Sequence, residues 1–95
     1  MPRAEHIPTF EIRHYQEMGR NIRALRMIRK LTQEELAEET DLSARTIKRI
    51  EAGESITLQN IMTLCLALNC TLIEIMPHEF LRYVSPILRD IYMVS

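Results

Sequence analysis

Apolar residues recur at steps of three and four along most of this chain, which is the spacing of one face of an α-helix. The first such run is Tyr15, Met18, Ile22 and Leu25, and residues 58–68 form a second one with a broad apolar face. No segment alternates strictly between apolar and polar residues, as a half-buried β-strand does. The pattern therefore predicts an all-α protein.

Capping residues divide this pattern into five short helices. A Ser or Thr at the N-cap satisfies free backbone N–H groups, and a Glu three residues later completes a capping box. Thr32, Ser43, Thr57 and Thr71 are the predicted N-caps, and Thr32 and Thr71 have the Glu of a capping box. Gly53 is typical of the residue after a helix. The predicted helices cover about 15–30, 33–39, 44–52, 58–68 and 72–76.

A tight turn at residues 40–42 joins the second and third predicted helices. Asp tolerates the left-handed conformation better than most residues other than glycine, so Asp41 is the predicted turn residue. Ala37 is small, and we expect the third helix to cross the second there. Ile47 and Ile50 fall on the inward face of the third helix, which leaves its cationic residues outward.

We divide the chain into an N-terminal arm at 1–14, a helical domain at 15–76 and a C-terminal helical tail at 77–95. Ser85 and Pro86 can begin a separate final helix in the tail. An apolar stripe in the tail is interpreted as a dimer or partner surface, or as a cover for the core. Its residues are Phe80, Val84, Ile87, Leu88 and Ile91.

The formal net charge is −1, from 12 Lys and Arg against 13 Asp and Glu. Nucleic-acid-binding domains are usually basic, so the total argues mildly against DNA binding. The distribution argues for it, because basic residues gather in the first and third predicted helices and acidic residues in the second. The basic residues are Arg20, Arg23, Arg26, Arg29, Lys30, Arg45, Lys48 and Arg49.

The two cysteines, Cys65 and Cys70, are predicted to be free thiols, because a helical pair five apart is poorly placed for a disulfide. Reduced thiols fit the cytoplasm. The N-terminus shows no signal peptide, and no apolar run approaches the roughly 20 residues that span a bilayer. We therefore expect a cytoplasmic protein that does not enter membranes.

Neither a metal site nor an active site is expected. His78 with the two cysteines lacks a fourth ligand for tetrahedral zinc, and the histidines have no ligand-like spacing. With only two glycines there is no phosphate-binding glycine loop, and no nucleophile elbow or paired catalytic carboxylates are present. We expect no cofactor and no enzymatic activity.

The chain resembles the lambda-repressor-like, Cro/C1-type helix-turn-helix family, also called the XRE family. The resemblance covers roughly residues 18–76 and rests on IRALRMIRKLTQEELA, on Ile47 and Ile50, on RIEAGE and on LCLALNCTLIEI. There are two departures: Asp41 replaces the usual turn glycine, and Ile56 replaces a common proline before the fourth helix. The resemblance implies a compact five-helix domain, here with an additional C-terminal helical tail.

The resemblance also implies a sequence-specific transcriptional regulator, usually a repressor, that binds an inverted repeat of double-stranded DNA as a homodimer. Positions that read base edges in the family carry Ala44, Arg45, Lys48 and Arg49. Positions that touch the DNA backbone carry Gln33, Ser43 and Thr46, and Arg20 and Arg23 are further candidates unless they form a merely solvated face. Arg26 and Glu51 match a structural ion pair between the first and third helices.

A second hypothesis belongs to another class of protein. The chain could be chiefly a protein-interaction module, such as an antitoxin whose tail binds a small partner protein and whose DNA binding serves autoregulation. The apolar tail around Phe80 would then be the partner surface, and the acidic net charge fits this alternative slightly better.

Overall fold

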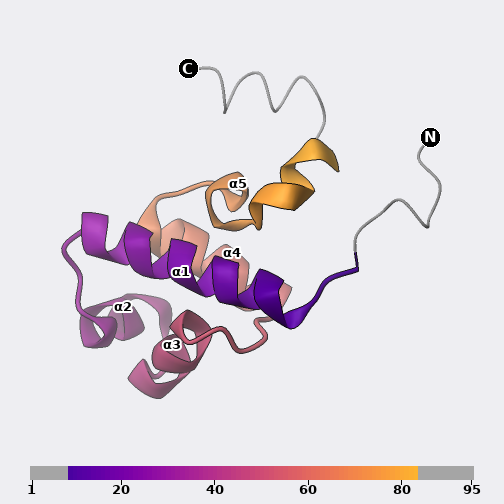
Figure 1. Ribbon diagram of the computed structural model, residues 1–95. Helices are drawn as coiled ribbons and strands as arrows, with labels where there is room; N and C mark the ends of the chain where they lie inside the picture. Colours follow the sequence, from indigo (N-terminus) through magenta and orange to yellow (C-terminus); the bar gives the residue numbers. More distant parts are fainter. Residues whose placement is uncertain (1–8, 84–95) are drawn as a thin grey trace.

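The computed structural model describes residues 9–83, and every regular element among them is helical. In chain order the helices are α1 (Ile12–Ile28), α2 (Gln33–Thr40), α3 (Ala44–Glu51), α4 (Leu58–Leu68) and α5 (Leu72–Ile75), followed by a 3-10 helix at His78–Tyr83 (Figure 1). The predicted all-α class and the order of five helices are confirmed.

The long helix α1 forms the base on which the others are placed. It packs against α3, α4 and α5, while α2 packs against α3 and α4. In Figure 1, α2 and α3 lie below α1, whereas α5 lies above it. The core between the helices is aliphatic. Its fully buried large residues include Ile22, Leu36, Ile47, Leu64, Leu68 and Ile75.

The predicted caps hold the short helices in place. Thr32 Oγ1 accepts from the Glu35 N–H at 3.0 Å, and Glu35 accepts from the Thr32 N–H at 2.8 Å. This arrangement lowers the pKa of Glu35, chiefly through the hydrogen bond from the Thr32 backbone. Ser43 caps α3 with one hydrogen bond, which its hydroxyl accepts from the Thr46 N–H, and Asp41 adopts the left-handed conformation with φ of 60°. The sequence signals for the helix-turn-helix were therefore correct.

The first helix differs from its prediction at its start, because it begins at Ile12 rather than at Tyr15, whereas its end at Ile28 lies close to the predicted end near Lys30. At its start, the buried His14 accepts the Glu11 N–H on Nδ1 at 2.7 Å. Apolar spacing could not reveal this turn, because a histidine takes the buried position. Part of the predicted arm thus belongs to α1.

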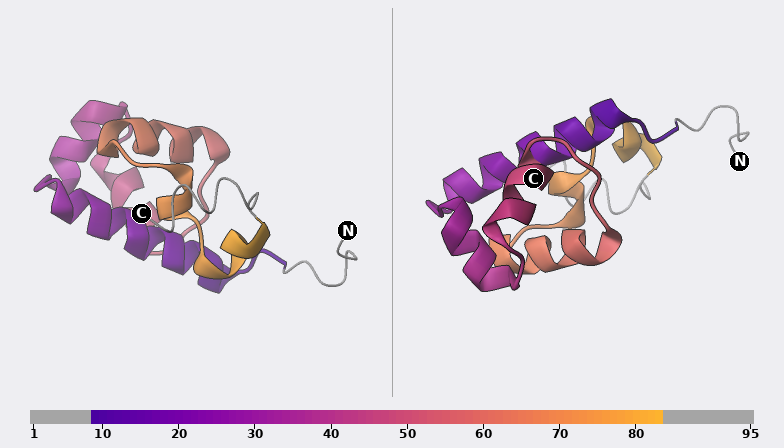
Figure 2. Two further views of the ribbon diagram at one scale, coloured as in Figure 1. Left: turned by 90° about the horizontal axis from the view of Figure 1, so that it is seen from above. Right: turned by 90° about the horizontal axis from the view of Figure 1, so that it is seen from below.

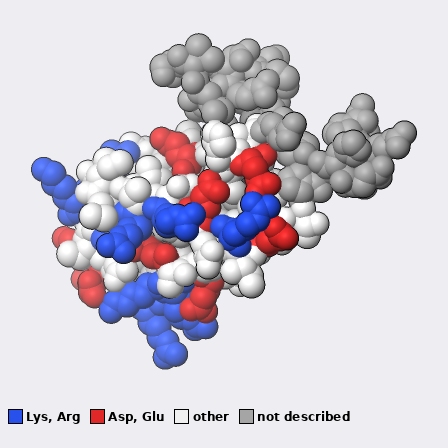
Figure 3. All heavy atoms as spheres, in the orientation of Figure 1, with Lys and Arg blue, Asp and Glu red and all other residues white. Residues whose placement is uncertain are grey.

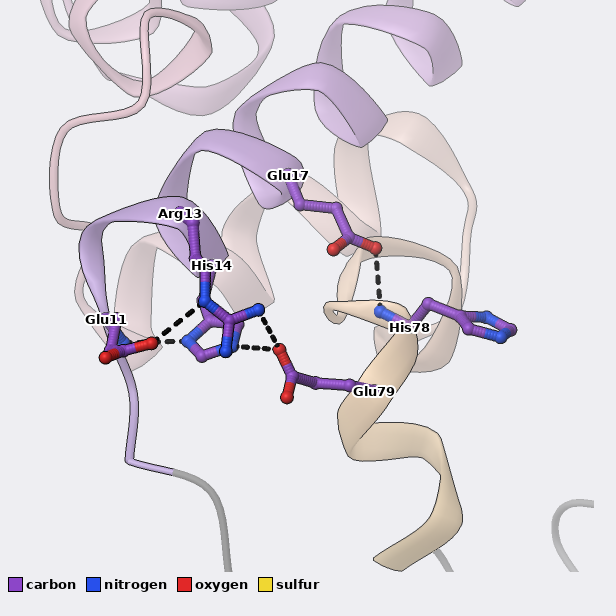
Figure 4. A network of polar contacts seen from close by, with 6 residues as sticks. All are labelled: Glu11, Arg13, His14, Glu17, His78 and Glu79. Atoms are coloured by element: carbon purple, nitrogen blue, oxygen red, sulfur yellow. Dashed lines mark hydrogen bonds and ion pairs between the residues drawn. The ribbon is translucent and has the colours of Figure 1, made fainter.

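The 3-10 helix is bound to α1 by a polar network (Figure 4). Glu79 accepts from His14 Nε2 and from Arg13, the latter at 2.6 Å, and the His78 N–H donates to Glu17 at 2.7 Å. Because His14 Nδ1 already accepts a hydrogen bond, its proton lies on Nε2. These two donors lower the pKa of Glu79, the His14 hydrogen bond most strongly. No pattern in the sequence predicted this network.

Phe80 also belongs to this region, where its ring packs on those of His14 and Phe10 at centroid distances of 4.8 and 5.2 Å. The first residues of the predicted tail are therefore joined to the domain. Residues 84–95 lie outside the described part of the chain, and with them the predicted final helix and Val84, Ile87, Leu88 and Ile91. None of the described helices is long and apolar enough to cross a membrane.

Candidate nucleic-acid interface

The outer face of α3 is cationic because its inner face is fixed in the core. Ile47 and Ile50 are buried, and the remaining faces of this amphipathic helix expose Arg45, Lys48 and Arg49. Figure 3 shows Lys and Arg atoms gathered at the lower end of the molecule, where α3 lies, with acidic atoms beside them. Figure 2 (right) looks onto this side of the molecule.

Arg45 is the cation on α3 that has no partner within residues 9–83. Its side chain is exposed, and among residues 9–83 it makes neither a hydrogen bond nor an ion pair. Ala44, beside it, is small and half-buried. Ser43 and Thr46 are occupied with each other, with 2.9 Å between their hydroxyl oxygens and 3.0 Å from the Thr46 nitrogen to Ser43 Oγ.

Lys48 and Arg49 each face an acidic side chain. Lys48 Nζ lies 3.9 Å from Glu34 Oε1 in α2, and both side chains are mostly exposed. Arg49 is held more closely, since its Nε donates to the two carboxylate oxygens of Glu54 at 3.1 and 3.2 Å. The three predicted cations of α3 are therefore not equivalent in the unbound protein.

Arg26 of α1 and Glu51 of α3 form a two-pronged ion pair with Nε–Oε2 and Nη2–Oε1 distances of 2.6 and 2.9 Å. Only 12% of the Arg26 side chain and 4% of the Glu51 side chain are exposed. The hydrogen bonds that Arg26 donates to Glu51 raise the pKa of Arg26, and Arg26 also donates to the Leu31 carbonyl at 2.8 Å. The pair fixes the end of α3 against α1.

Gln33 joins the same network from the start of α2, because its Nε2 donates to Glu51 Oε1 at 3.1 Å. The side chain is half-buried. A carboxamide nitrogen has two hydrogens, so one donor of Gln33 is held by Glu51 and the other has no partner among residues 9–83. The contact to Glu51 orients this amide at the N-terminus of α2.

The basic residues of α1 serve different purposes. Arg20 and Arg23 are exposed and make no polar contact with the described residues. Arg29 instead donates to the carbonyls of Leu68 and Asn69 at 2.8 and 3.0 Å, which satisfies the C-terminus of α4. Arg29, like Arg26, therefore acts in packing, and the basic cluster predicted for the first helix is smaller than its sequence suggests.

Gly19 is a site residue that our sequence reasoning missed. It is buried where α1 crosses α3, and a Cβ added there would lie 2.4 Å from the Ile50 carbonyl oxygen. The available signal was an isolated glycine inside a helical pattern, which indicates a close approach of two backbones when it has a packing role. Gly19 allows α3 to sit close to α1.

The cysteines lie away from α3, at the end of α4, and both are free and half-buried. Burial raises the pKa of the Cys65 thiol, and it raises that of Cys70 to about 12. Between residues 9 and 83, no group of three or more His, Cys, Asp or Glu side chains could hold a metal ion.

Two helices joined at a left-handed Asp41, with the second helix exposing cations, define a helix-turn-helix domain. The family model described as helix-turn-helix, HTH_3, matches residues 22–75. The match spans more than half of the chain, so this protein belongs to the Cro/C1-type helix-turn-helix family of DNA-binding transcription regulators. No curated protein shows a significant similarity to it.

Solved structures support the same fold. The restriction-modification controller protein C.AhdI from Aeromonas hydrophila is similar at 31% identity and a TM-score of 0.62, over 64% of this chain and 94% of that one. ComR from Streptococcus suis is 30% identical, with a TM-score of 0.60, over 86% of this chain and 29% of ComR. The DNA-binding domain of BldD, at 20% identity and a TM-score of 0.66 over 72% and 100%, shares the fold.

Proposed function

We propose that this protein is a repressor that recognises an inverted-repeat operator as a homodimer, with α3 of each copy in the DNA major groove. The observation that carries the proposal is Arg45, an exposed guanidinium with no partner among the described residues, on a helix whose opposite face is fixed in the core. An arginine so placed can donate to O6 and N7 of a guanine, a contact worth about 1–3 kcal/mol of discrimination.

The residues around Arg45 support a division of labour between bases and phosphates. Ala44 is small enough for a base edge or a thymine methyl to approach. Lys48 and Arg49, at the later turns of α3, reach either bases or flanking phosphates. Phosphate contacts fix the position of the protein on DNA without reading sequence. Candidates for these contacts are Gln33, Ser43 and Thr46 around the two helix starts and Arg20 and Arg23 on α1.

A homodimer is supported by an apolar stripe on α4, which differs from the surface predicted in the tail. Leu58, Met62 and Leu66 follow at four-residue steps and are 67%, 56% and 84% exposed. Such spacing places them on one side of the helix, and burying them against a second copy would remove this surface from water. Phe80 is less suited to a partner than expected, because its ring packs on Phe10 and His14.

The test begins with selection of bound sites from random duplex DNA, which reports half-site sequence, spacing and symmetry. A homodimer on two successive major grooves predicts half-sites about 34 Å apart. Arg45→Ala should then lose preference for one base pair of each half-site, by about 1–3 kcal/mol, while weak binding to random DNA persists.

Arg23→Ala is the matched control, since it removes an exposed arginine from a proposed phosphate contact. It should weaken binding to all sequences alike. If Arg45→Ala keeps the full preference for the selected site, Arg45 does not read bases. Selection of single, unpaired half-sites would contradict the homodimer. Co-purification of the chain with a different small protein would instead favour the antitoxin-type hypothesis.

A further inference from the structure

The end of α3 bends the chain so that an acidic side chain returns to the DNA-binding face. Gly53, with φ of 99°, takes the left-handed conformation directly after the helix, and the Glu54 N–H donates to the Arg49 carbonyl at 3.1 Å. This turn brings the Glu54 carboxylate to the Arg49 guanidinium, with contacts of 3.1 Å from both Nε and Nη2 to Oε1. The backbone turn at Gly53 therefore places the two side chains close together.

The pair lies at the edge of a polar cleft of about 170 Å³ between α3 and the start of α4. Its lining residues besides the pair are Thr46, Ile50, Ser55, Thr57 and Asn60. Both members of the pair remain accessible to solvent, with 57% of the Arg49 side chain and 52% of the Glu54 side chain exposed. An incoming phosphate can therefore reach the guanidinium.

We propose that Glu54 is a built-in competitor of the DNA phosphate for Arg49, so that binding exchanges one anion for another. The inference rests on the proposed function. A carboxylate and a phosphate both offer two oxygens to the fork of an arginine, so they contend for the same donors. Arg45 has no such partner among the described residues. Of these two arginines, only Arg49 has its Nε–Nη2 edge held by a carboxylate within residues 9–83, so a phosphate can use that edge only after Glu54 has left it.

The exchange has a consequence for salt dependence. Each Lys or Arg that neutralises a phosphate releases condensed cations, which steepens the slope of log K against log salt by about 0.9. Salt also screens the exposed Arg49–Glu54 ion pair, so rising salt makes the exchange easier while it weakens the contact with DNA. Arg49 therefore adds less to the slope than a cation without an internal partner. Its gain in affinity is reduced as well, by about twofold to fivefold per subunit for an exposed pair.

The variant Glu54→Gln tests the competition while keeping the shape of the side chain. Binding to a random-sequence duplex and to the selected operator should tighten by about twofold to fivefold per subunit. The salt slope should steepen, by at most about 0.9 per subunit. The ratio between the two affinities should stay unchanged, because the proposal places Arg49 on a phosphate and leaves Arg45 untouched. Fluorescence anisotropy at a series of salt concentrations measures all three quantities.

Glu39→Gln is the matched control, because Glu39 is exposed on α2 and makes no polar contact with the rest of the described chain. It removes the same charge but should change affinity and slope much less. The double variant Arg49→Gln/Glu54→Gln separates competition from simple repulsion between Glu54 and DNA. Under competition, Glu54→Gln gives no gain once Arg49 is absent. A gain that persists in the Arg49→Gln background would overturn the proposal.

Two further results are informative. If the wild-type protein reads its operator through Arg45 but Glu54→Gln changes neither affinity nor slope, the competition is refuted while the proposed function stands. If neither the wild type nor any variant binds duplex DNA, the proposed function fails and the competition fails with it. Thermal unfolding of each variant, followed by circular dichroism, confirms that the proteins compared are folded.

Discussion

Gly19 in α1 and Ile50 in α3 touch backbone to backbone, so that a Cβ on Gly19 would lie 2.4 Å from the Ile50 carbonyl oxygen and 2.9 Å from that of Glu51. Both obstacles are backbone atoms, which cannot rotate away as a side chain can. The contact lies directly under the helix that presents Arg45. The distance between α1 and α3 is thus set by the absence of a side chain at residue 19.

Replacing Gly19 with Ala tests this close contact. Alanine is favoured over glycine inside a helix by about 1 kcal/mol, so propensity alone predicts a more stable protein. We expect the steric clash to outweigh this gain and to lower the free energy of unfolding by about 1–3 kcal/mol, as overpacking typically does. Urea unfolding measures the change, and operator affinity should fall because α3 is displaced.

Ala24→Gly serves as the opposite control on the exposed side of α1. It should cost about 1 kcal/mol through propensity alone and leave operator affinity unchanged. A Gly19→Ala protein that is more stable than the wild type and binds DNA normally would show that α1 and α3 can move apart freely.

The Arg26–Glu51 pair predicts a large effect when one partner is removed. Arg26→Met leaves the Glu51 carboxylate buried without its cation, which costs about 3–5 kcal/mol of unfolding free energy. In Arg26→Met/Glu51→Leu no unpaired charge remains, so much of the loss should be recovered. Chemical denaturation of both variants measures the difference. Arg23→Met, on an exposed position nearby, should change stability by less than about 0.5 kcal/mol. Equal losses in the single and double variants would contradict this account.

Glu79 predicts a dependence of stability on acidity. Its pKa in the folded protein lies below the ordinary value of 4.5, because His14 and Arg13 donate to the carboxylate. A depressed pKa stabilises the fold fully above the unfolded value, and this contribution is lost as pH falls through the folded value. Urea midpoints should therefore drop below about pH 4.5, and Glu79→Gln should flatten the drop. A Glu79→Gln protein with the wild-type acid limb would exclude this carboxylate as the cause.

The helices and the turn could be predicted because their signals are local. Thr32, Ser43 and Asp41 act within three residues of their own positions, and each appears in the structure as its residue type suggested. The contact of His14 with Glu79 could not be predicted, since 65 residues separate the two and neither belongs to an apolar pattern. The base-reading and phosphate-binding roles remain predictions, because they depend on a duplex.

The same distinction applies to the cations of the first and third helices. Their distribution along the sequence, with basic residues gathered in these two helices, argued for DNA binding. The structure assigns Arg29 to the carbonyls that end α4 and pairs Arg49 with Glu54. Charge along a sequence therefore overstates the charge available to DNA, because side chains with long reach find partners on other elements or across a turn. Arg45 has no such partner among the described residues.

A charge placed on the apolar stripe of α4 should dissociate the proposed homodimer. Leu66 is 84% exposed in the single chain, so Leu66→Lys should not disturb the core of the monomer. In a dimer, the lysine would have to be buried without a partner, which is costly. Sedimentation should show monomers at concentrations where the wild type is dimeric. Thermal unfolding should show that the monomeric variant still folds. Operator binding should weaken strongly, whereas each copy should still bind a half-site.

Gln59→Lys adds the same charge to α4 at an exposed polar position and should leave the dimer intact. A Leu66→Lys protein that remains dimeric would place the interface elsewhere.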